Sequence, residues 1–307
     1  MSINSQNVLD YPNNNTIFMV WNFKQGVAVK EAFKSLCGLI SNLNNSARTR
    51  FPDAGASVVL GIGFDAWHLL ELPVPLPKEF EAFAPITGAK HTAVATRGDL
   101  HLHIRSDVYS FCIDAATAIT ETLNEVAISI EEVHGFRYWD SRSILGFVDG
   151  TENPHGEDRA YFGVIGEDDP LYKGGSYLFV QKYLHDLQAW RSLPVSEQEK
   201  VIGRSKADDI EMPDDVKPSN AHSALANVGD DLKIVRDNMP FGNVASNEMG
   251  TYFIAYASSF QTVKKMLTNM FVGVPEGNYD RILDFSTPQT GTLFFVPTFE
   301  MLDSFGG

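Results

Sequence analysis

The nonapeptide at residues 146–154, GFVDGTENP, sets one carboxylate among residues that favour tight turns. Asp149 lies between a valine and a glycine, and the acidic side chain of Glu152 follows three positions later. A carboxylate in such a turn can move protons, or it can join a second carboxylate as a ligand of a divalent metal. Because no further carboxylates follow at the spacing of an EF-hand, the metal signal is weak, and both chemistries stay open at this point.

Three histidines have the surroundings of candidate ligands. His101 and His103 lie two residues apart on a predicted strand, so their side chains face the same side. With no third ligand nearby, we interpret them as an exposed face of an antiparallel sheet rather than as a metal site. His222 lies in SNAHSALANV, whose small residues allow the close approach of a flat ligand. On these residues alone, a surface loop is the simpler interpretation of His222.

A cation and an amide follow in the segment LKIVRDNMPFGN. Residues 232–236 predict a short strand, which directs Arg236 and Asn238 to one side and Asp237 to the other. An arginine and an amide on one face can bind an anion or stabilise a developing negative charge. The same two residues also fit an ordinary surface pair.

The elements that must position these residues alternate between strands and helices in both halves of the chain. This order predicts an α+β fold of two ferredoxin-like domains with antiparallel sheets, at residues 1–140 and 141–307. The polar stretch 204–231 predicts a long irregular connection, and connections of that length are usually functional or mobile. The predicted strands cover 15–23, 56–64, 91–106 (two strands), 129–139, 174–186, 250–258 and 291–298, and the predicted helices cover 26–44, 107–124, 187–203 and 260–273.

The composition argues against several classes of partner. Of the 307 residues, 39 are acidic and 24 are basic, which gives a formal charge of −15. Such a field repels phosphate backbones and anionic lipid, so we expect no nucleic-acid or membrane partner. No apolar run is long enough to span a bilayer. Cys37 and Cys112 lie far apart in helix-like stretches, and we interpret them as buried free thiols in a reducing compartment.

Taken together, GFVDGTENP, His222 among small residues and IVRDNMPFG resemble the dye-decolorizing peroxidases, particularly their bacterial cytoplasmic branch. The segments IGRSKADDIEM and LDFSTPQTGTLFFVP are also similar to that family, and the resemblance extends over nearly the whole chain. It implies two ferredoxin-like domains, with one haem b per chain in the C-terminal one. It also implies an enzyme that reduces hydrogen peroxide through a ferryl intermediate and oxidises small organic donors such as dyes and phenols.

The resemblance also implies a role for each matching residue. His222 is expected to be the proximal ligand of the haem iron, and Asp149, Arg236 and Asn238 are expected to form the catalytic distal side. There, Asp149 would move a proton between the peroxide oxygens, Arg236 would stabilise the charge on the leaving oxygen, and Asn238 would hold the peroxide or a bridging water. The other expected haem-binding residues are Thr151, Glu152, Asn153 and Arg204 near the propionates, and Asp284 as the carboxylate that orients His222.

Two alternative functions remain open on the sequence. One is a haem-handling protein that binds haem, stores it or releases its iron without peroxidase turnover. The other is a hydrolase with a metal at Asp149 and Glu152. Because a bulky dye cannot enter a small pocket, we also hypothesise that Trp139 or Trp190 relays electrons, although each also fits packing. The family suggests homo-oligomers, dimers or larger, and the lack of an export signal and of a nanocompartment-targeting tail predicts a cytoplasmic location.

Overall fold

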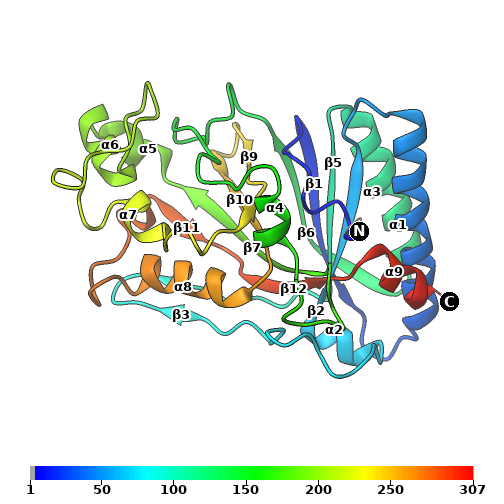
Figure 1. The fold of residues 1–307 in the computed structure, drawn as a ribbon. Coiled ribbons are helices and arrows are strands. Elements are labelled where there is room, and N and C mark those ends of the chain that lie inside the picture. The colour runs from blue at the N-terminus through cyan, green and yellow to red at the C-terminus, as the bar shows by residue number, and fades with distance from the viewer. Residues whose placement is uncertain (1–3, 307) are drawn as a thin grey trace.

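The computed structural model describes residues 4–306, in which helices pack around antiparallel β-sheet (Figure 1). The strands are β1 (Asn15–Phe23), β2 (Ser57–Gly63), β3 (Ile86–Thr87), β4 (Thr92–Ala93), β5 (Leu100–Ser106), β6 (Ala127–Phe136), β7 (Ser176–His185), β8 (Val235–Arg236), β9 (Met239–Asn243), β10 (Glu248–Ala257), β11 (Ser286–Pro288) and β12 (Thr292–Val296). The helices are α1 (Lys30–Arg50), α2 (Phe64–Leu69), α3 (Tyr109–Leu123), α4 (Asp158–Gly163), α5 (Leu187–Ser192), α6 (Val195–Ile202), α7 (His222–Ala226), α8 (Phe260–Phe271), α9 (Phe299–Gly306) and the 3₁₀ helix η1 (Arg281–Asp284). The predicted α+β class is confirmed.

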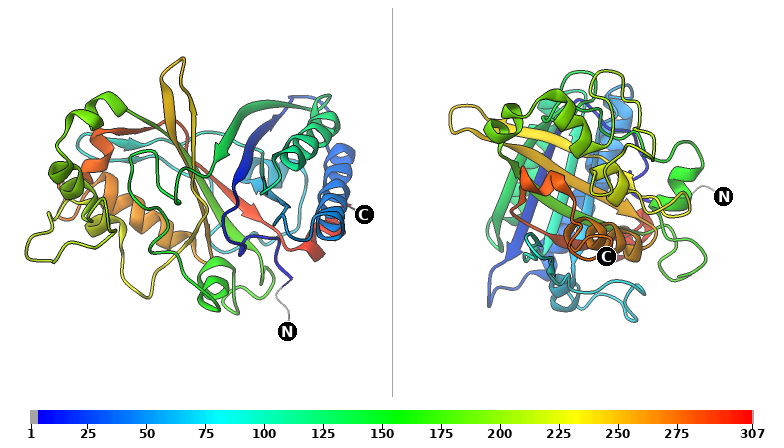
Figure 2. Two further views of the ribbon diagram at one scale, coloured as in Figure 1. Left: turned by 90° about the horizontal axis from the view of Figure 1, so that it is seen from above. Right: turned by 90° about the vertical axis from the view of Figure 1, so that its left-hand side faces the viewer.

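The main sheet joins the two halves of the chain. Its strand order is β11-β7-β12-β2-β5-β1-β6-β9-β10-β8, and β7 also pairs with β10. The strands from β7 round to β10 therefore form a closed ring, in which the late strand β12 pairs with the early strand β2. Seen from above, α1 and α3 lie at one end of the molecule and α5, α6 and α8 at the other, with the strands between them (Figure 2).

Strand alternation sends successive side chains into two different cores. On β1, Ile17 and Met19 pack into the core covered by α1 and α3, whereas Phe18 and Val20 point into the interior of the ring. The helix α1 meets the outer core with Phe33, Leu36, Cys37 and Ile40, whose spacing of i, i+3, i+4 and i+7 places them on one face. The side chains of Phe33, Leu36 and Ile40 each contribute about 1.5–3 kcal/mol by their burial.

The interpretation of His101 and His103 as an exposed face is wrong, because both are fully buried inside the ring. On β5, the alternate residues Leu100 and Leu102 face the core covered by α1 and α3. The opposite face of β5, with His101 and His103, is enclosed because the strands close into a ring. Burial lowers the pKa of His101 to about 3. A sequence pattern reports the alternation of a strand, but it does not report that its second face is enclosed.

Other expectations from the sequence are confirmed in part. Cys37 and Cys112 are buried free thiols as predicted, and burial raises the pKa of each to about 12. Of the two strands predicted within 91–106, the second is β5, whereas the first is reduced to the two residues of β4, which pair with β3. Within residues 4–306, no helix combines the length and apolarity needed to cross a membrane.

Candidate active site

A pocket in the second half of the chain collects most of the residues singled out above. Loop 143–152, the irregular stretch after α6, helices α7 and α8, and strands β8 and β10 supply its walls. Its apolar lining includes Leu145, Phe147, Leu232, Ile234, Phe253, Met266, Leu267, Met270 and Ile282, and its polar lining includes Asp149, Thr151, Glu152, Arg204, His222, Arg236 and Asn238.

His222 is the first residue of α7, and a buried carboxylate fixes the orientation of its ring. Nδ1 lies 2.7 Å from Oδ2 of Asp280, whose side chain is fully buried. The other carboxylate oxygen, Oδ1, accepts from the backbone N–H of Ile282 at 3.0 Å and so caps η1. Among residues 4–306, Nε2 of His222 has no hydrogen-bond partner. The ring therefore offers one nitrogen to a ligand in the pocket.

The carboxylate beside His222 is Asp280 and not Asp284, which corrects the expectation from the sequence. Oδ1 of Asp284 lies 2.5 Å from Nζ of Lys90 and 3.0 Å from Nε2 of His91, at the surface. Partial burial tends to raise the pKa of Asp284, but the contacts with Lys90 and His91 outweigh it and hold the pKa below its ordinary value. The two acids are four residues apart: Asp280 is the N-cap of η1 and points inward, whereas Asp284 is the last residue of η1 and lies at the surface.

Asp149 and Asn238 meet in the pocket. Nδ2 of Asn238 donates to Oδ2 of Asp149 at 3.2 Å, while Oδ1 of Asn238 accepts from the backbone N–H of Ile254 at 3.2 Å. Arg236 is half-buried, and within the described chain its guanidinium donates no hydrogen bond. Asp149, Arg236 and Asn238 also line a second cavity next to the first. These three side chains are therefore shared by the walls of the two cavities.

Comparison with known proteins decides the family. The description "Dyp-type peroxidase, N-terminal" matches residues 6–137, and "Dyp-type peroxidase, C-terminal" matches residues 140–301. The chain belongs to the Dyp-type peroxidase family. The family resemblance predicted from the three motifs is therefore confirmed.

Relatives are similar to this peroxidase over most of their length. It is 51% identical over 292 residues to a dye-decolorizing peroxidase of Rhodococcus erythropolis, covering 94% of this chain and 84% of that one. A dye-decolorizing peroxidase of Mycobacterium tuberculosis is 47% identical, with 90% and 82% covered. A solved dye-decolorizing peroxidase from Bacteroides thetaiotaomicron has a TM-score of 0.96 at 50% identity, with 99% of this chain and 98% of that chain covered. A DypB variant from Rhodococcus jostii in complex with haem has a TM-score of 0.91 at 42% identity, with all of both chains covered.

Acidic side chains surround Arg204 at the rim of the peroxidase pocket. Its Nε donates to Oδ1 of Asp209 at 2.8 Å, and its Nη1 lies 3.5 Å from Glu211 and 3.7 Å from Glu152. Thr151 lines the same rim and is exposed. Glu152 is therefore held near a cation, whereas Asp149 is held by an amide, so the two carboxylates have different partners.

Asn153 has contacts that the sequence did not indicate. Its Nδ2 donates to the backbone oxygen of Arg236 at 2.9 Å, and its Oδ1 accepts from the backbone N–H of Arg236 at 2.9 Å. The side chain lines the second cavity and is absent from the lining described for the first. It thereby links the GFVDGTENP turn to β8. Gly150, at φ +86°, provides the left-handed backbone that this turn requires.

The two candidate relay tryptophans differ sharply in exposure. Trp139 is 77% exposed, whereas Trp190 is 2% exposed and donates through Nε1 to the backbone oxygen of Leu145 at 2.9 Å. Leu145 is part of the pocket lining. Trp139 is therefore accessible to a bulky molecule, and Trp190 supports the pocket wall.

The donor set of the pocket fits haem. Two histidines line this largely apolar cavity, and both ring nitrogens of His185 are hydrogen-bonded, to Ser286 and Thr251. That leaves Nε2 of His222 as the imidazole nitrogen open to a ligand among the described residues, which suits a metal whose other ligands come from a macrocycle. The carboxylate on the opposite ring nitrogen is the usual partner of a metal-binding histidine. Arg204 and Lys233, both in the lining, provide cations for the acidic edge of such a group.

Proposed function

We propose that this chain is a haem-dependent peroxidase that reduces hydrogen peroxide and oxidises small organic donors of the dye-like and phenolic kind. The observation that carries the proposal is the joint presence, in one pocket of a Dyp-type fold, of His222 and the trio Asp149, Arg236 and Asn238. One haem b per chain would be held by Nε2 of His222. The solved DypB relative that contains haem supports this choice of cofactor.

Haem, when bound, supplies the redox-active iron that exchanges electrons with peroxide and donor. The side chains of the chain supply the rest of the chemistry. Asp280 keeps the His222 ring in one orientation and accepts a hydrogen bond from its Nδ1–H, which makes Nε2 a stronger electron donor to a bound metal. Asp149 takes the proton from one peroxide oxygen and returns it to the other. Arg236 stabilises the negative charge on the departing oxygen, and Asn238 holds the Asp149 carboxylate in place.

Residues at the rim complete the proposed haem site. We assign Thr151, Glu152 and Arg204 to the edge of the haem, where Arg204 would exchange part of its carboxylate contacts for a propionate. Asn153 contributes through its two hydrogen bonds to the backbone of Arg236. We also divide the chain near residue 140, with haem in the second domain. The two family matches, which meet near that residue, support the division.

Assembly and location complete the proposal. The peroxidase forms homo-oligomers, dimers or larger, and acts in the cytoplasm. A relative from Mycobacterium smegmatis was solved as an encapsulated peroxidase, which supports assembly in the family. The two buried free thiols fit a reducing compartment. Light scattering of the purified protein and cell fractionation test the two statements separately.

The test is the reaction of the haem-loaded protein with one equivalent of peroxide, followed by absorbance in a stopped-flow instrument. Asp149→Ala and Arg236→Ala should keep the Soret band and slow the peroxide reaction by about 10²- to 10⁴-fold, the usual worth of a proton-transfer group or a charge-stabilising donor. Glu167→Ala, which removes an exposed partner of Lys173, is the matched control and should react as the wild type does. Wild-type rates in both active-site variants would refute the distal assignment.

The haem-handling alternative is not favoured, because the curated relatives are named as peroxidases. It makes a distinct prediction that the same preparation can check. A haem-handling protein would bind haem and lose its iron or its colour after a few equivalents of peroxide, without steady oxidation of a donor. Sustained turnover of a phenol with catalytic amounts of protein rejects that alternative.

A further inference from the structure

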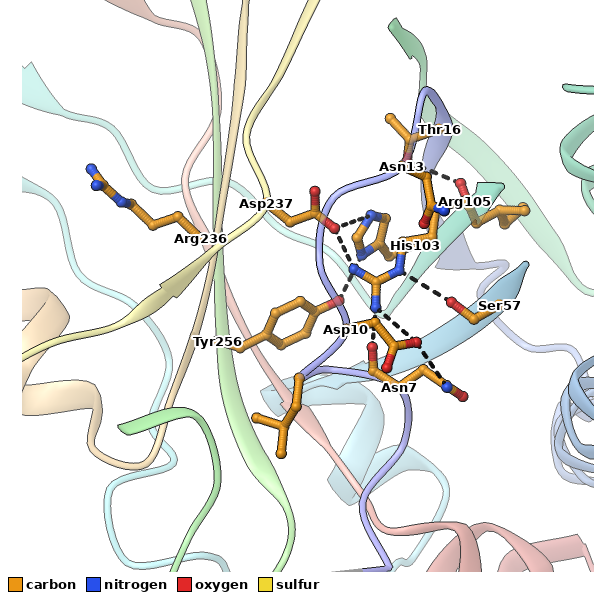
Figure 3. A network of polar contacts seen from close by, with 12 residues as sticks. Asn7, Asp10, Asn13, Thr16, Ser57, His103, Arg105, Arg236, Asp237 and Tyr256 are labelled. Carbon is orange, nitrogen blue, oxygen red and sulfur yellow. Dashed lines mark hydrogen bonds and ion pairs between the residues drawn. The ribbon is translucent and has the colours of Figure 1, made fainter. Parts of the chain in front are cut away.

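The interior of the strand ring contains a charged cluster that the proposed chemistry does not use. Arg105 on β5 and Asp237 after β8 form an ion pair between Nη1 and Oδ2, and their exposures are 0% and 1%. Arg105 also donates through Nε to Oγ of Ser57 at 3.1 Å and through Nη2 to the backbone oxygen of Asn7. Nε2 of His103 lies 3.6 Å from Oδ2 of Asp237. Figure 3 shows Asp237 reaching from the second half of the chain into partners from the first half.

Asp237 shares its backbone with two proposed distal residues. Figure 3 shows that Arg236 points away from the cluster. Arg236 and Asn238 both line the pocket. The strand β8 ends at Arg236 and β9 begins at Met239, so Asp237 lies in the short gap between two strands. Within that gap its backbone N–H donates to the oxygen of Ile254 at 3.2 Å.

The contacts around this gap fix the distal side chains in turn. On one side, Asn153 holds both backbone polar groups of Arg236 at 2.9 Å. On the other, Asn238 accepts from the N–H of Ile254 and donates to Asp149. The pairings of β8 and β9 with β10 hold the backbone on either side of the gap. The side chain of Asp237 adds a contact with the first half of the chain through Arg105. A shift of that side chain would therefore act on both Arg236 and Asn238, its two neighbours.

We propose that Asp237 and Arg105 are positioning residues of the distal side: their buried ion pair ties the Arg236–Asn238 segment to the first half of the chain and sets its distance from Asp149. The inference rests on the proposed peroxidase function of that side. Neither residue touches the pocket, so both act through the backbone between them and the distal side chains.

Stability alone does not explain the choice of a buried ion pair here. The attraction between two buried charges is largely offset by the free energy needed to remove both from water, and well-packed apolar residues often stabilise such a position better. Burial raises the pKa of the Asp237 carboxyl, against the opposing effect of Arg105. An ion pair, however, has fixed directions that an apolar contact lacks. Directional contacts are what a site needs when a displacement of about 1 Å can cost about 10²-fold in rate.

The experiment compares three changes with a matched control. Asp237→Asn removes the charge at constant size, and Arg105→Lys keeps the charge but loses the fork of donors. Because a lone buried charge can prevent folding, the double variant Arg105→Met with Asp237→Leu replaces the pair by apolar side chains. The control is Asp99→Asn, which removes a fully buried carboxylate that pairs with Arg97 and is absent from the pocket lining.

Two measurements are made on each variant. The first is the second-order rate of the haem-loaded protein with peroxide, alongside KM for a phenolic donor. The double variant and Asp237→Asn should lose about 10- to 100-fold in the peroxide rate and keep KM for the donor, whereas Arg105→Lys should recover part of the loss. The second is hydrogen exchange of the full chain without haem. The amides of Asp237 and Ile254 should exchange faster in the double variant and in Asp237→Asn, and at the wild-type rate in Asp99→Asn.

The outcomes separate the inference from the proposed function. Wild-type peroxide rates and wild-type exchange in the double variant would overturn the positioning role. So would an equal loss of peroxide rate in Asp99→Asn, because that would indicate general loosening of the fold. If the wild-type protein binds haem but does not react with peroxide, the proposed function is refuted. Hydrogen exchange would still decide whether the ion pair holds the Arg236–Asn238 segment.

Discussion

Replacement of Asp280 by asparagine should weaken haem binding because it removes the charged partner of His222. The substitution keeps the size of the side chain and leaves one oxygen to cap η1 through Ile282. It takes away the carboxylate oxygen that lies 2.7 Å from Nδ1 in a fully buried position. A hydrogen bond to a charged group contributes about 1.5–3 kcal/mol, which corresponds to about 10- to 150-fold in the dissociation constant of haem. That range agrees with the usual effect of losing the carboxylate behind a metal-binding histidine.

The assay is the transfer of haem from the loaded protein to an excess of a haem scavenger, followed at the Soret band. The matched control is Asp284→Asn, whose carboxylate pairs with Lys90 and His91 instead. It should release haem at the wild-type rate. The reasoning fails if Asp280→Asn releases haem as slowly as the wild type. It also fails if the two variants behave alike, because only one of these acids contacts His222.

Two further predictions concern stability and electron transfer. Burial holds the pKa of His101 at about 3, whereas the unfolded chain binds this proton near pH 6.5, so the free energy of unfolding should fall as the pH drops below that value. This histidine alone accounts for a loss of about 2 kcal/mol in the free energy of unfolding between pH 7 and pH 5. In urea titrations, His101→Gln should reduce the measured loss by that amount. The control His155→Gln, at an exposed position, should leave the loss unchanged. Trp139→Phe should remove radical signal after peroxide addition and slow the oxidation of a bulky dye more than that of a small phenol, whereas Trp190→Phe should leave the dye-to-phenol ratio unchanged. Unchanged radical spectra in both tryptophan variants would reject both as relays.

Local periodicity predicted the arrangement of the distal segment correctly. The alternation of a short strand was enough to separate Arg236 and Asn238 from Asp237, and the structure directs them to opposite sides. His222 was different: its own neighbours favoured a surface loop, and only the resemblance of three separated segments to one family marked it as a ligand. Strand alternation depends on only a few consecutive residues, so it can be predicted from the sequence.

Features that depend on ring closure could not be predicted in this way. The buried state of His101 and His103 requires β12 to pair with β2, a contact between residues more than two hundred positions apart. The Arg105–Asp237 ion pair likewise joins two segments that carry no mutual signal in the sequence. The choice of Asp280 over Asp284 depends on which end of a four-residue 3₁₀ helix points inward. No spacing rule distinguishes those two acids.

A crystal structure of the haem-loaded protein tests the central claim most directly. The account predicts that Nε2 of His222 binds the iron, and that Asp149, Arg236 and Asn238 lie together on the opposite face of the haem. Iron bound by any other side chain would contradict it. So would a haem placed with that trio outside contact of its open face.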